Sequence, residues 1–172
     1  PGPLAEYVGF TEAEVRKLCE TYGRNLEEMK EWYDGYHFIN AESVYSPRSV
    51  VTAVLTGVCD SYWNKTETFV ALRIDMNFEG LKDDVLSMLA GERVPVNTGS
   101  FSNDMTTFHT EDDVLTLLIH LGYLGYDFYN KDVFIPNNEI RGEYVNAIAA
   151  SEWGEVSLAL SARDAIAQIK EK

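Results

Sequence analysis

Five residues near the middle of the chain could bind a divalent cation. They are Asp104, His109, Glu111, Asp112 and Asp113, and they offer the carboxylate oxygens and imidazole nitrogen that such ions accept as ligands. Three of the acids, however, follow a threonine in the pattern Thr-Glu-Asp-Asp. This pattern is typical of a helix start, where negative side chains interact favourably with the positive end of the helix dipole. We therefore interpret the cluster as helix capping and predict no metal site.

Two catalytic motifs are absent from the sequence. A phosphate-binding P-loop requires a Gly-Lys pair followed by Ser or Thr, and the chain has no Gly-Lys pair. A nuclease of the PD-(D/E)XK type needs Asp/Glu-x-Lys on a strand to hold magnesium. The only Glu-x-Lys spacing, Glu28 to Lys30, lies in a segment of helical periodicity. We predict that this chain alone is not an enzyme and has no catalytic residue.

The two other histidines and the two cysteines are not predicted to act as a general base or a nucleophile. His37 lies among aromatic residues and His120 within an apolar stretch, so we expect both to be hydrogen-bonded core residues. Cys19 and Cys59 do not form a CxxC pair. Their spacing excludes a zinc finger and favours a reducing, cytoplasmic compartment.

The composition is that of a globular protein. Of 172 residues, 45% are hydrophobic, and 14 basic residues stand against 28 acidic ones, for a formal net charge of −14. This apolar content excludes disorder as a description of the whole chain. No apolar run approaches the roughly 18 residues of a membrane span, so we expect an acidic cytoplasmic protein without a membrane partner.

The spacing of apolar and turn residues predicts an α+β fold that is mostly helical, beginning with a helical region over residues 1–78. The elements expected there are a helix that starts in a capping box at Thr11 and ends at Gly23, a helix that ends at Asp34, a hairpin of strands 36–39 and 43–45, a helix that begins at Ser46-Pro47 and ends at Gly57, and a helix with Phe69, Leu72 and Met76.

The second part, residues 79–150, has an order of elements similar to a winged helix-turn-helix. The pattern predicts a helix with Leu81, Val85, Met88 and Leu89, a short edge strand at 93–96, a buried helix at 114–121, a hairpin of strands 123–128 and 132–135, and a helix with Ile140, Tyr144, Ala147 and Ile148. Residues 151–172 are expected to form a C-terminal helix that leads to a further domain.

A winged helix raises the question of DNA binding, because this motif can place a helix in the major groove. Between residues 79 and 128 two basic residues stand against nine acidic ones, a net charge of −7, and no Lys or Arg lies between Arg93 and Lys131. Contacts of Lys and Arg with phosphates supply much of the affinity for DNA. The charge pattern therefore argues against direct nucleic-acid binding and favours a protein-contact role.

Several longer strings, in a fixed order, resemble one known family. They are EEMKEWYDGYHF (27–38), VYSPRSVV (44–51), YWNKT (62–66), NDMTTFHTEDDVLTLLIHLGYLGYD (103–127) and VFIPNNEIRGEY (133–144). Together they resemble the downstream half of the AAA-ATPase-like domain of bacterial proteins that usually end in a PD-(D/E)XK nuclease-like domain. The resemblance covers about residues 7 to 160, nearly the whole chain.

In that family a P-loop core precedes this segment and the nuclease-like domain follows it. The resemblance implies that the chain is a non-catalytic lid and winged-helix region, which packs on the nucleotide-binding core and relays its state through two alternative sets of contacts. It implies no cofactor for this chain itself, with ATP and magnesium bound by the intact protein, and it names the P-loop core and the nuclease-like domain as partners.

The resemblance also implies three residues near the nucleotide in the intact protein. Tyr45, Pro47 and Arg48 are similar to a proline-bearing helix start that lies near the adenine in related signal-transduction ATPases, with Arg48 as a phosphate-sensing arginine. Tyr45 stands where those relatives carry glycine. A proline at the first helical position also stabilises the helix by itself, so both roles of Pro47 stay open.

The WYDGY motif is expected to be structural, since its plain interpretation is an aromatic corner packed under the first hairpin. Its members are Trp32, Tyr33, Asp34 and Tyr36.

Two other functions stay open beside the regulatory one. The first is a nucleic-acid-binding winged helix that serves the nuclease-like domain, which a salt-dependent gel shift with duplex DNA tests. The second is a protein-interaction module that self-associates, which light scattering tests.

Overall fold

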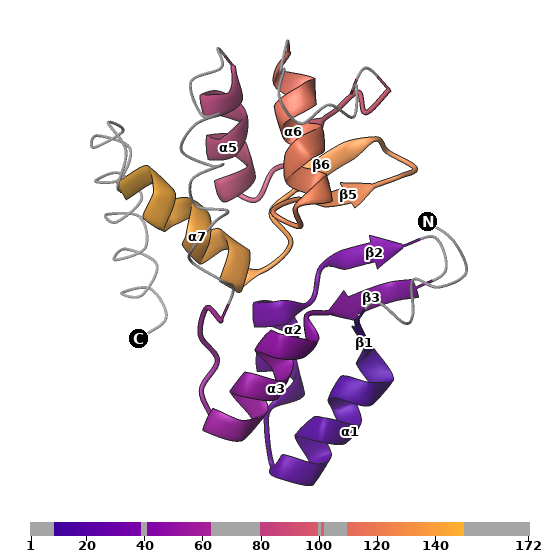
Figure 1. Ribbon diagram of the computed structural model, residues 1–172, viewed down its shortest axis with the longest axis vertical. Helices are drawn as coiled ribbons and strands as arrows, with labels where there is room; N and C mark the ends of the chain where they lie inside the picture. Colours follow the sequence, from indigo (N-terminus) through magenta and orange to yellow (C-terminus); the bar gives the residue numbers. More distant parts are fainter. Residues whose placement is uncertain (1–8, 39–40, 63–79, 100, 102–109, 150–172) are drawn as a thin grey trace.

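A computed structural model describes residues 9–38, 41–62, 80–99, 101 and 110–149. Within these ranges the fold is α+β, as predicted, with six helices and two antiparallel sheets of three strands each. Figure 1 shows two halves, one above the other, with a helix running beside the boundary between them. We call residues 9–62 the N-terminal half and residues 80–149 the C-terminal half.

The first helix begins and ends as predicted, and the second ends as predicted. Helix α1 (Glu12–Tyr22) starts with a capping box in which Thr11 and Glu14 bond reciprocally, and it ends at Gly23 in the left-handed conformation. Helix α2 (Leu26–Tyr33) is capped by Asn25, whose side chain accepts hydrogen bonds from two amides of the first turn.

The first sheet contains the predicted hairpin and one further strand. Strands β2 (Tyr36–Phe38) and β3 (Ala41–Tyr45) are antiparallel, and β1 (Phe10–Thr11) pairs with the other edge of β3, so the order is β1-β3-β2. Strand β1 was not predicted, because two residues are too few to show an alternating pattern. Helix α3 (Pro47–Thr56) follows, with proline at its first position and Gly57 at its end, as expected.

The C-terminal half contains three helices and the second sheet. The elements are α5 (Leu81–Leu89), β4 (Val94–Pro95), α6 (Glu111–His120), β5 (Gly125–Asp127), β6 (Asp132–Phe134) and α7 (Asn138–Ala149). The sheet order is β4-β6-β5, which places β4 and its proline at an edge, where a missing N–H leaves no ladder bond unmade. The predicted boundary between residues 78 and 79, the helix with Phe69 and the C-terminal helix lie outside the described residues.

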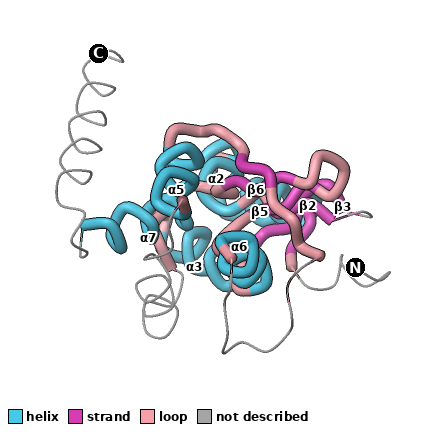
Figure 2. Tube along the Cα trace, turned by 90° about the horizontal axis from the view of Figure 1, so that it is seen from above, coloured by secondary structure: helices cyan, strands magenta, loops and turns pink. Residues whose placement is uncertain are grey.

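Each half buries its own hydrophobic cluster. In the N-terminal half it comprises Val15, Cys19, Met29, Tyr33, Tyr45, Val50, Ala53 and Val54. In the C-terminal half it comprises Leu81, Val85, Met88, Leu89, Val94, Val96, Val114, Leu115, Leu118, Tyr123, Leu124, Val133, Ile140, Tyr144, Ala147 and Ile148. The view from above in Figure 2 shows the strands gathered toward one side of the molecule and helices α5 and α7 toward the other.

Two sequence-based expectations about burial are wrong. His37 and His120 are both exposed rather than core residues. His37 lies on a three-residue strand and packs its ring against Phe134, and His120 is the last residue of α6 and packs against Phe101.

Candidate functional site

The junction between the two halves is the part of the molecule where the motif strings meet. Two pairs of elements pack against each other there: strand β2 lies beside β5, and helix α2 lies beside α7. The segments involved come from the WYDGY, YSPRS, GYLGY and IPNNE strings of the sequence. Residues up to 103 positions apart in sequence are hydrogen-bonded here.

Asp34 organises the turn between α2 and β2. Its Oδ1 accepts a hydrogen bond from the Gly35 amide at 2.7 Å, and its Oδ2 accepts from the Ser43 hydroxyl at 3.0 Å and from the Tyr45 hydroxyl at 3.2 Å. Hydrogen bonds to a carboxylate are stronger than those between neutral groups. This side chain therefore fixes the hairpin against the end of α2.

The same turn contacts the start of α7 in the other half. Gly35 has φ +109°, and a Cβ on it would collide with the backbone of Pro136. Asn137 donates from Nδ2 to the Asp34 carbonyl at 2.8 Å, while its Oδ1 accepts from the Ile140 amide at 3.0 Å and so caps α7. One asparagine thus starts a helix and joins the two halves.

Tyr36 forms the second contact across the junction. Its hydroxyl donates to the Gly122 carbonyl, just beyond α6, at 2.7 Å. Burial raises the pKa of Tyr36 well above its ordinary value, so the hydroxyl stays protonated and keeps its role as donor. Gly125 lies beneath the Phe134 ring with no room for a Cβ, which lets strand β5 approach β2.

Two acidic side chains of α7 form the third contact. Glu139 is 1% exposed, and its Oε1 accepts from the Ser49 hydroxyl at 3.0 Å and from the Tyr62 amide at 2.7 Å. Glu143 is 4% exposed and accepts from the Ser61 hydroxyl at 2.7 Å. Burial of a carboxylate costs free energy unless hydrogen-bond donors such as these offset the loss of water.

Tyr33 holds the segment around residue 60 from the N-terminal side. Its hydroxyl donates to the Asp60 carbonyl at 2.9 Å and accepts from the Asp60 amide at 3.0 Å. Burial raises the pKa of this hydroxyl too. Residues 60–62 are therefore bound on one side by Tyr33 and on the other by the acids of α7.

The WYDGY residues do more than form a corner under the hairpin. Trp32 packs against the N-terminal cluster, with its ring centroid 6.3 Å from that of Tyr33. Tyr33 and Asp34 bind neighbouring segments of their own half, whereas Tyr36 reaches into the other half. The sequence did not indicate that the Tyr36 side chain contacts the other half.

The three residues implied near a nucleotide do not lie together as one exposed group. Tyr45 is 1% exposed, and burial raises the pKa of its hydroxyl, which is bound to Asp34. Pro47 and Arg48 are exposed at the first turn of α3. Of the three residues, therefore, Pro47 and Arg48 have side chains that a bound molecule could contact.

The residues that the sequence interpretation missed are Ser49, Asn137, Glu139 and Glu143. Asn137 and Glu139 lie in the string IPNNE, and Glu143 follows Glu139 by four positions on α7. Acids at positions 139 and 143, directly before the apolar positions 140 and 144, were the available signal. From the sequence, Glu139 and Glu143 are expected to be exposed to solvent, because the sequence does not show that the N-terminal half packs over them.

The acidic cluster is a helix start, as predicted, for the acids that the structure describes. Thr110 and Asp113 form a reciprocal capping box, and Asp112 accepts a hydrogen bond from the Asn97 amide at 3.0 Å. Asp104 and His109 lie outside the described residues. Over the described ranges, no group of three or more His, Cys, Asp or Glu side chains could hold a metal ion.

One member of the cluster forms a pair of acids between two helix starts. Glu111 of α6 shares a hydrogen bond with Asp84 of α5, and this bond, together with burial, raises the pKa of Glu111 to about 7. Asp113 and Asp112 are its neighbours on the same helix. The two carboxyl groups thus lie together between the first turns of α5 and α6.

Neither cysteine has the properties of a nucleophile. Burial raises the pKa of Cys19 and raises that of Cys59 to about 11. The thiolate is the reactive form of cysteine, so both thiols stay protonated near neutral pH.

A pocket of about 390 Å³ opens beside the junction. Its walls come from both halves: Glu31 of α2, Met88, Leu89 and Gly91 at the end of α5, and residues 135–138 with Arg141 around the start of α7. The shape of this pocket therefore depends on how the two halves are placed.

Comparison of the chain with protein-family models, with curated proteins and with solved structures found no match. Within the described ranges, no helix combines the length and apolar character needed to cross a bilayer.

Proposed function

We propose that this chain is a non-catalytic regulatory region of an AAA-like ATPase, which packs on a nucleotide-binding core and relays its state to a nuclease-like domain. The observation that carries the proposal is the junction, where the motif strings of both halves are bound through Asp34, Tyr36, Asn137 and the acids of α7. A relay needs two units whose relative placement can change. Two separate hydrophobic clusters joined by hydrogen bonds supply such units.

We further propose that the C-terminal half is a winged helix, with β5 and β6 as the wing. The chain order α5, β4, α6, β5, β6 and the sheet order β4-β6-β5 support this assignment, because they place a short strand between helices beside an antiparallel hairpin. Helix α6 is the helix that DNA-binding members of this architecture present to the major groove.

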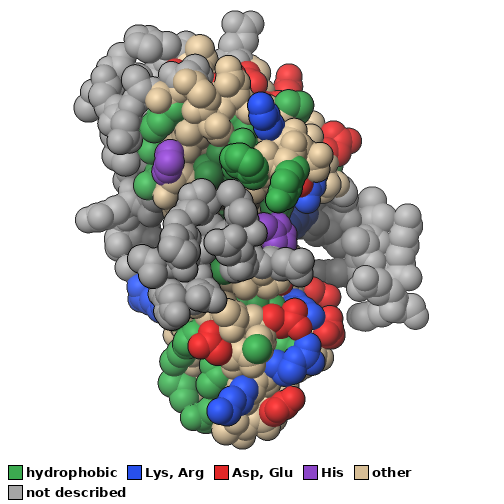
Figure 3. Space-filling model, turned by 90° about the vertical axis from the view of Figure 1, so that its right-hand side faces the viewer, with side chains coloured by type: hydrophobic (Ala, Val, Ile, Leu, Met, Phe, Trp, Pro, Cys, Tyr) green, Lys and Arg blue, Asp and Glu red, His purple; other side chains and the backbone are tan. Residues whose placement is uncertain are grey.

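Burial and charge favour protein contact over DNA binding by this half. Residues 113–118 of α6 are buried, and its first turn carries three acids, so the helix has little free surface for a groove. On the described part of the face in Figure 3, Lys and Arg alternate with Asp and Glu and form no continuous basic band.

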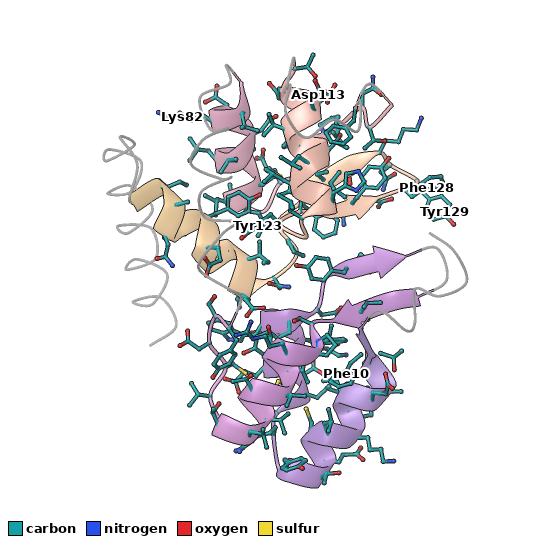
Figure 4. The ribbon with its side chains drawn as sticks, viewed as in Figure 1. Phe10, Lys82, Asp113, Tyr123, Phe128 and Tyr129 are labelled. Atoms are coloured by element: carbon teal, nitrogen blue, oxygen red, sulfur yellow. The ribbon has the colours of Figure 1, made fainter. Side chains whose placement is uncertain are left out.

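An exposed aromatic pair at the wing tip also fits a protein partner. Phe128 and Tyr129 are 59% and 83% exposed, and their ring centroids are 6.1 Å apart. Figure 4 shows them extending away from the hairpin. The turn is rigid, because Asp127 accepts hydrogen bonds from the Tyr129 and Asn130 amides. Rigid exposed aromatics are frequent at the centres of protein interfaces.

The exposed start of α3 is the surface that we propose faces the nucleotide-binding core. Pro47 and Arg48 lie there together, and Arg48 provides a cation for a phosphate. Tyr45 would act only by placing the backbone of this turn, because its side chain is buried.

Isothermal titration of this chain with Mg-ATP is the first test. We expect no binding, because the chain has no phosphate-binding loop of its own, and tight binding would overturn the proposal.

The second test uses a protein that includes the P-loop core. In that protein, Arg48→Ala should reduce nucleotide affinity or hydrolysis about tenfold or more. Arg16→Ala, another exposed arginine on α1, is the matched control and should have no effect.

A gel shift with duplex DNA at low ionic strength separates the proposal from nucleic-acid binding. We expect no shift. A shift that weakens steeply with salt would instead indicate a DNA-binding wing.

A further inference from the structure

Helix α7 belongs to one half and binds the other. Its residues Ile140, Tyr144 and Ile148 are fully buried in the C-terminal cluster. Its acids Glu139 and Glu143, four positions apart, accept hydrogen bonds from the N-terminal half. Any displacement of the bound segment therefore acts directly on a helix of the C-terminal core.

The bonds on the N-terminal side come from two places. Ser49 lies in the first turn of α3, and Ser61 and the Tyr62 amide lie in the segment that follows α3. Tyr33 binds the backbone of Asp60 in the same segment. Residues 60–62 thus bridge the cluster of the N-terminal half and α7.

The two hydrophobic clusters themselves are separate over the described residues. Separating apolar surfaces loses free energy in proportion to the exposed area. Hydrogen bonds, in contrast, are exchanged for bonds to water at a small net change in free energy. The hydrogen bonds that join α7 to Ser49 and residues 60–62 can therefore open while both cores stay folded.

We propose that Ser49, Ser61 and the Tyr62 amide, bound to Glu139 and Glu143, form a latch that holds the two halves in one of two arrangements. Release of the latch leaves the junction held by the Tyr36–Gly122 and Asn137–Asp34 bonds, about which the halves then move as rigid units, with α7 carrying the displacement into the C-terminal half. The inference rests on the proposed relay for its purpose. Its test uses this chain alone, without nucleotide, so a failed latch and a failed nucleotide relay give different results.

The test compares the chain with the variant Ser49→Ala/Ser61→Ala by NMR in a weakly aligned sample. In the parent chain, amides of α1 and α6 should fit one alignment tensor, because the latched halves tumble together. In the variant they should require two tensors, and exchange of the Tyr62 amide should rise about tenfold or more. Amides of Val15 and Leu115, in the two cores, should keep their protection.

A control and a second variant guard against a general loss of structure. Thr52→Ala removes a hydroxyl of the same helix α3 that donates to the Arg48 carbonyl one turn earlier, and it should leave one tensor. Glu139→Gln/Glu143→Gln keeps a carbonyl acceptor at each site and should show less opening than Glu139→Ala/Glu143→Ala.

Two results would overturn the latch. One is a single tensor in the serine variant with unchanged exchange of the Tyr62 amide. The other is a joint loss of protection at Val15 and Leu115, which would show that the halves form one cooperative core.

Discussion

The two halves of the molecule are stabilised by different means. Sixteen buried hydrophobic residues form the cluster of the C-terminal half, twice the eight of the N-terminal half over the described residues. In the smaller cluster the tyrosines Tyr33 and Tyr45 bind Asp60 and Asp34 through their hydroxyls. A small core leaves a small margin of stability. The N-terminal half therefore relies more on polar bonds of its own, while the C-terminal half relies on apolar packing.

The largest expected effect comes from the packing of the C-terminal half. Leu115→Ala removes a fully buried side chain of α6 and should lower the free energy of unfolding by about 2–5 kcal/mol, measured by urea denaturation. Leu55→Ala, on a leucine of α3 that is 66% exposed, should change it by less than about 0.5 kcal/mol. Similar losses for both variants would contradict the assigned burial.

The second effect concerns the junction. Gly35→Ala should lower stability by about 1–3 kcal/mol, since Gly35 combines positive φ with a backbone neighbour that leaves no room for a Cβ. Gly23→Ala is the matched control, because Gly23 also has positive φ but nothing within 4 Å. It should lose only the conformational part, about 1 kcal/mol. Thermal unfolding measures both, and equal losses would mean that the close contact with Pro136 is absent.

The third effect compares the two capping boxes. Thr11→Ala and Thr110→Ala each remove a side-chain bond to the first turn of a helix and should each cost about 0.5–2 kcal/mol. If the N-terminal half has the smaller margin, Thr11→Ala should expose amides of α1 to exchange more than Thr110→Ala exposes those of α6. Hydrogen exchange of each helix checks this difference, and the reverse order would contradict it.

The smallest effect is a difference in pH dependence. Glu111 has an ordinary pKa of 4.5 and a folded value of about 7, first because of its bond to Asp84. The folded state holds this proton more tightly, so the stabilisation is complete below pH 4.5 and is lost as the pH rises through about 7. Glu111→Gln should remove this decline, measured as the unfolding midpoint from pH 4 to 8.

Glu14 in the N-terminal half has the opposite sign. The bond from the Thr11 amide lowers its pKa below 4.5, so its contribution is present above that pH and is lost in acid. Glu14→Gln should therefore flatten only the acid side of the curve. A decline toward neutral pH that survives in Glu111→Gln would assign it to another group.

Local sequence patterns predicted most elements because the signals were local. Caps such as Thr11, Thr110 and Gly57, and the proline at the start of α3, act within one helical turn. The spacing of apolar residues likewise named the buried positions of α5 and α7. Strand β1 was not predicted, since its two residues are defined as a strand by their pairing with β3.

The site was less predictable for the same reason. Glu139 and Ser49 are 90 positions apart in sequence and become partners only when the halves pack together. The exposure of His37 and the reach of Tyr36 into the other half also depend on that packing. The motif strings indicated which segments matter, but not which side chains meet.

By itself, the sequence determined the α+β class, the boundaries of most helices, the buried faces and the acidic charge, because turns, caps and periodicity depend on neighbours along the chain. Only the tertiary structure decided that the strings WYDGY and IPNNE meet, that two acids of α7 are buried, and that Asp84 and Glu111 lie together between α5 and α6. These features depend on long-range contacts, whose partners leave no regular spacing in the sequence.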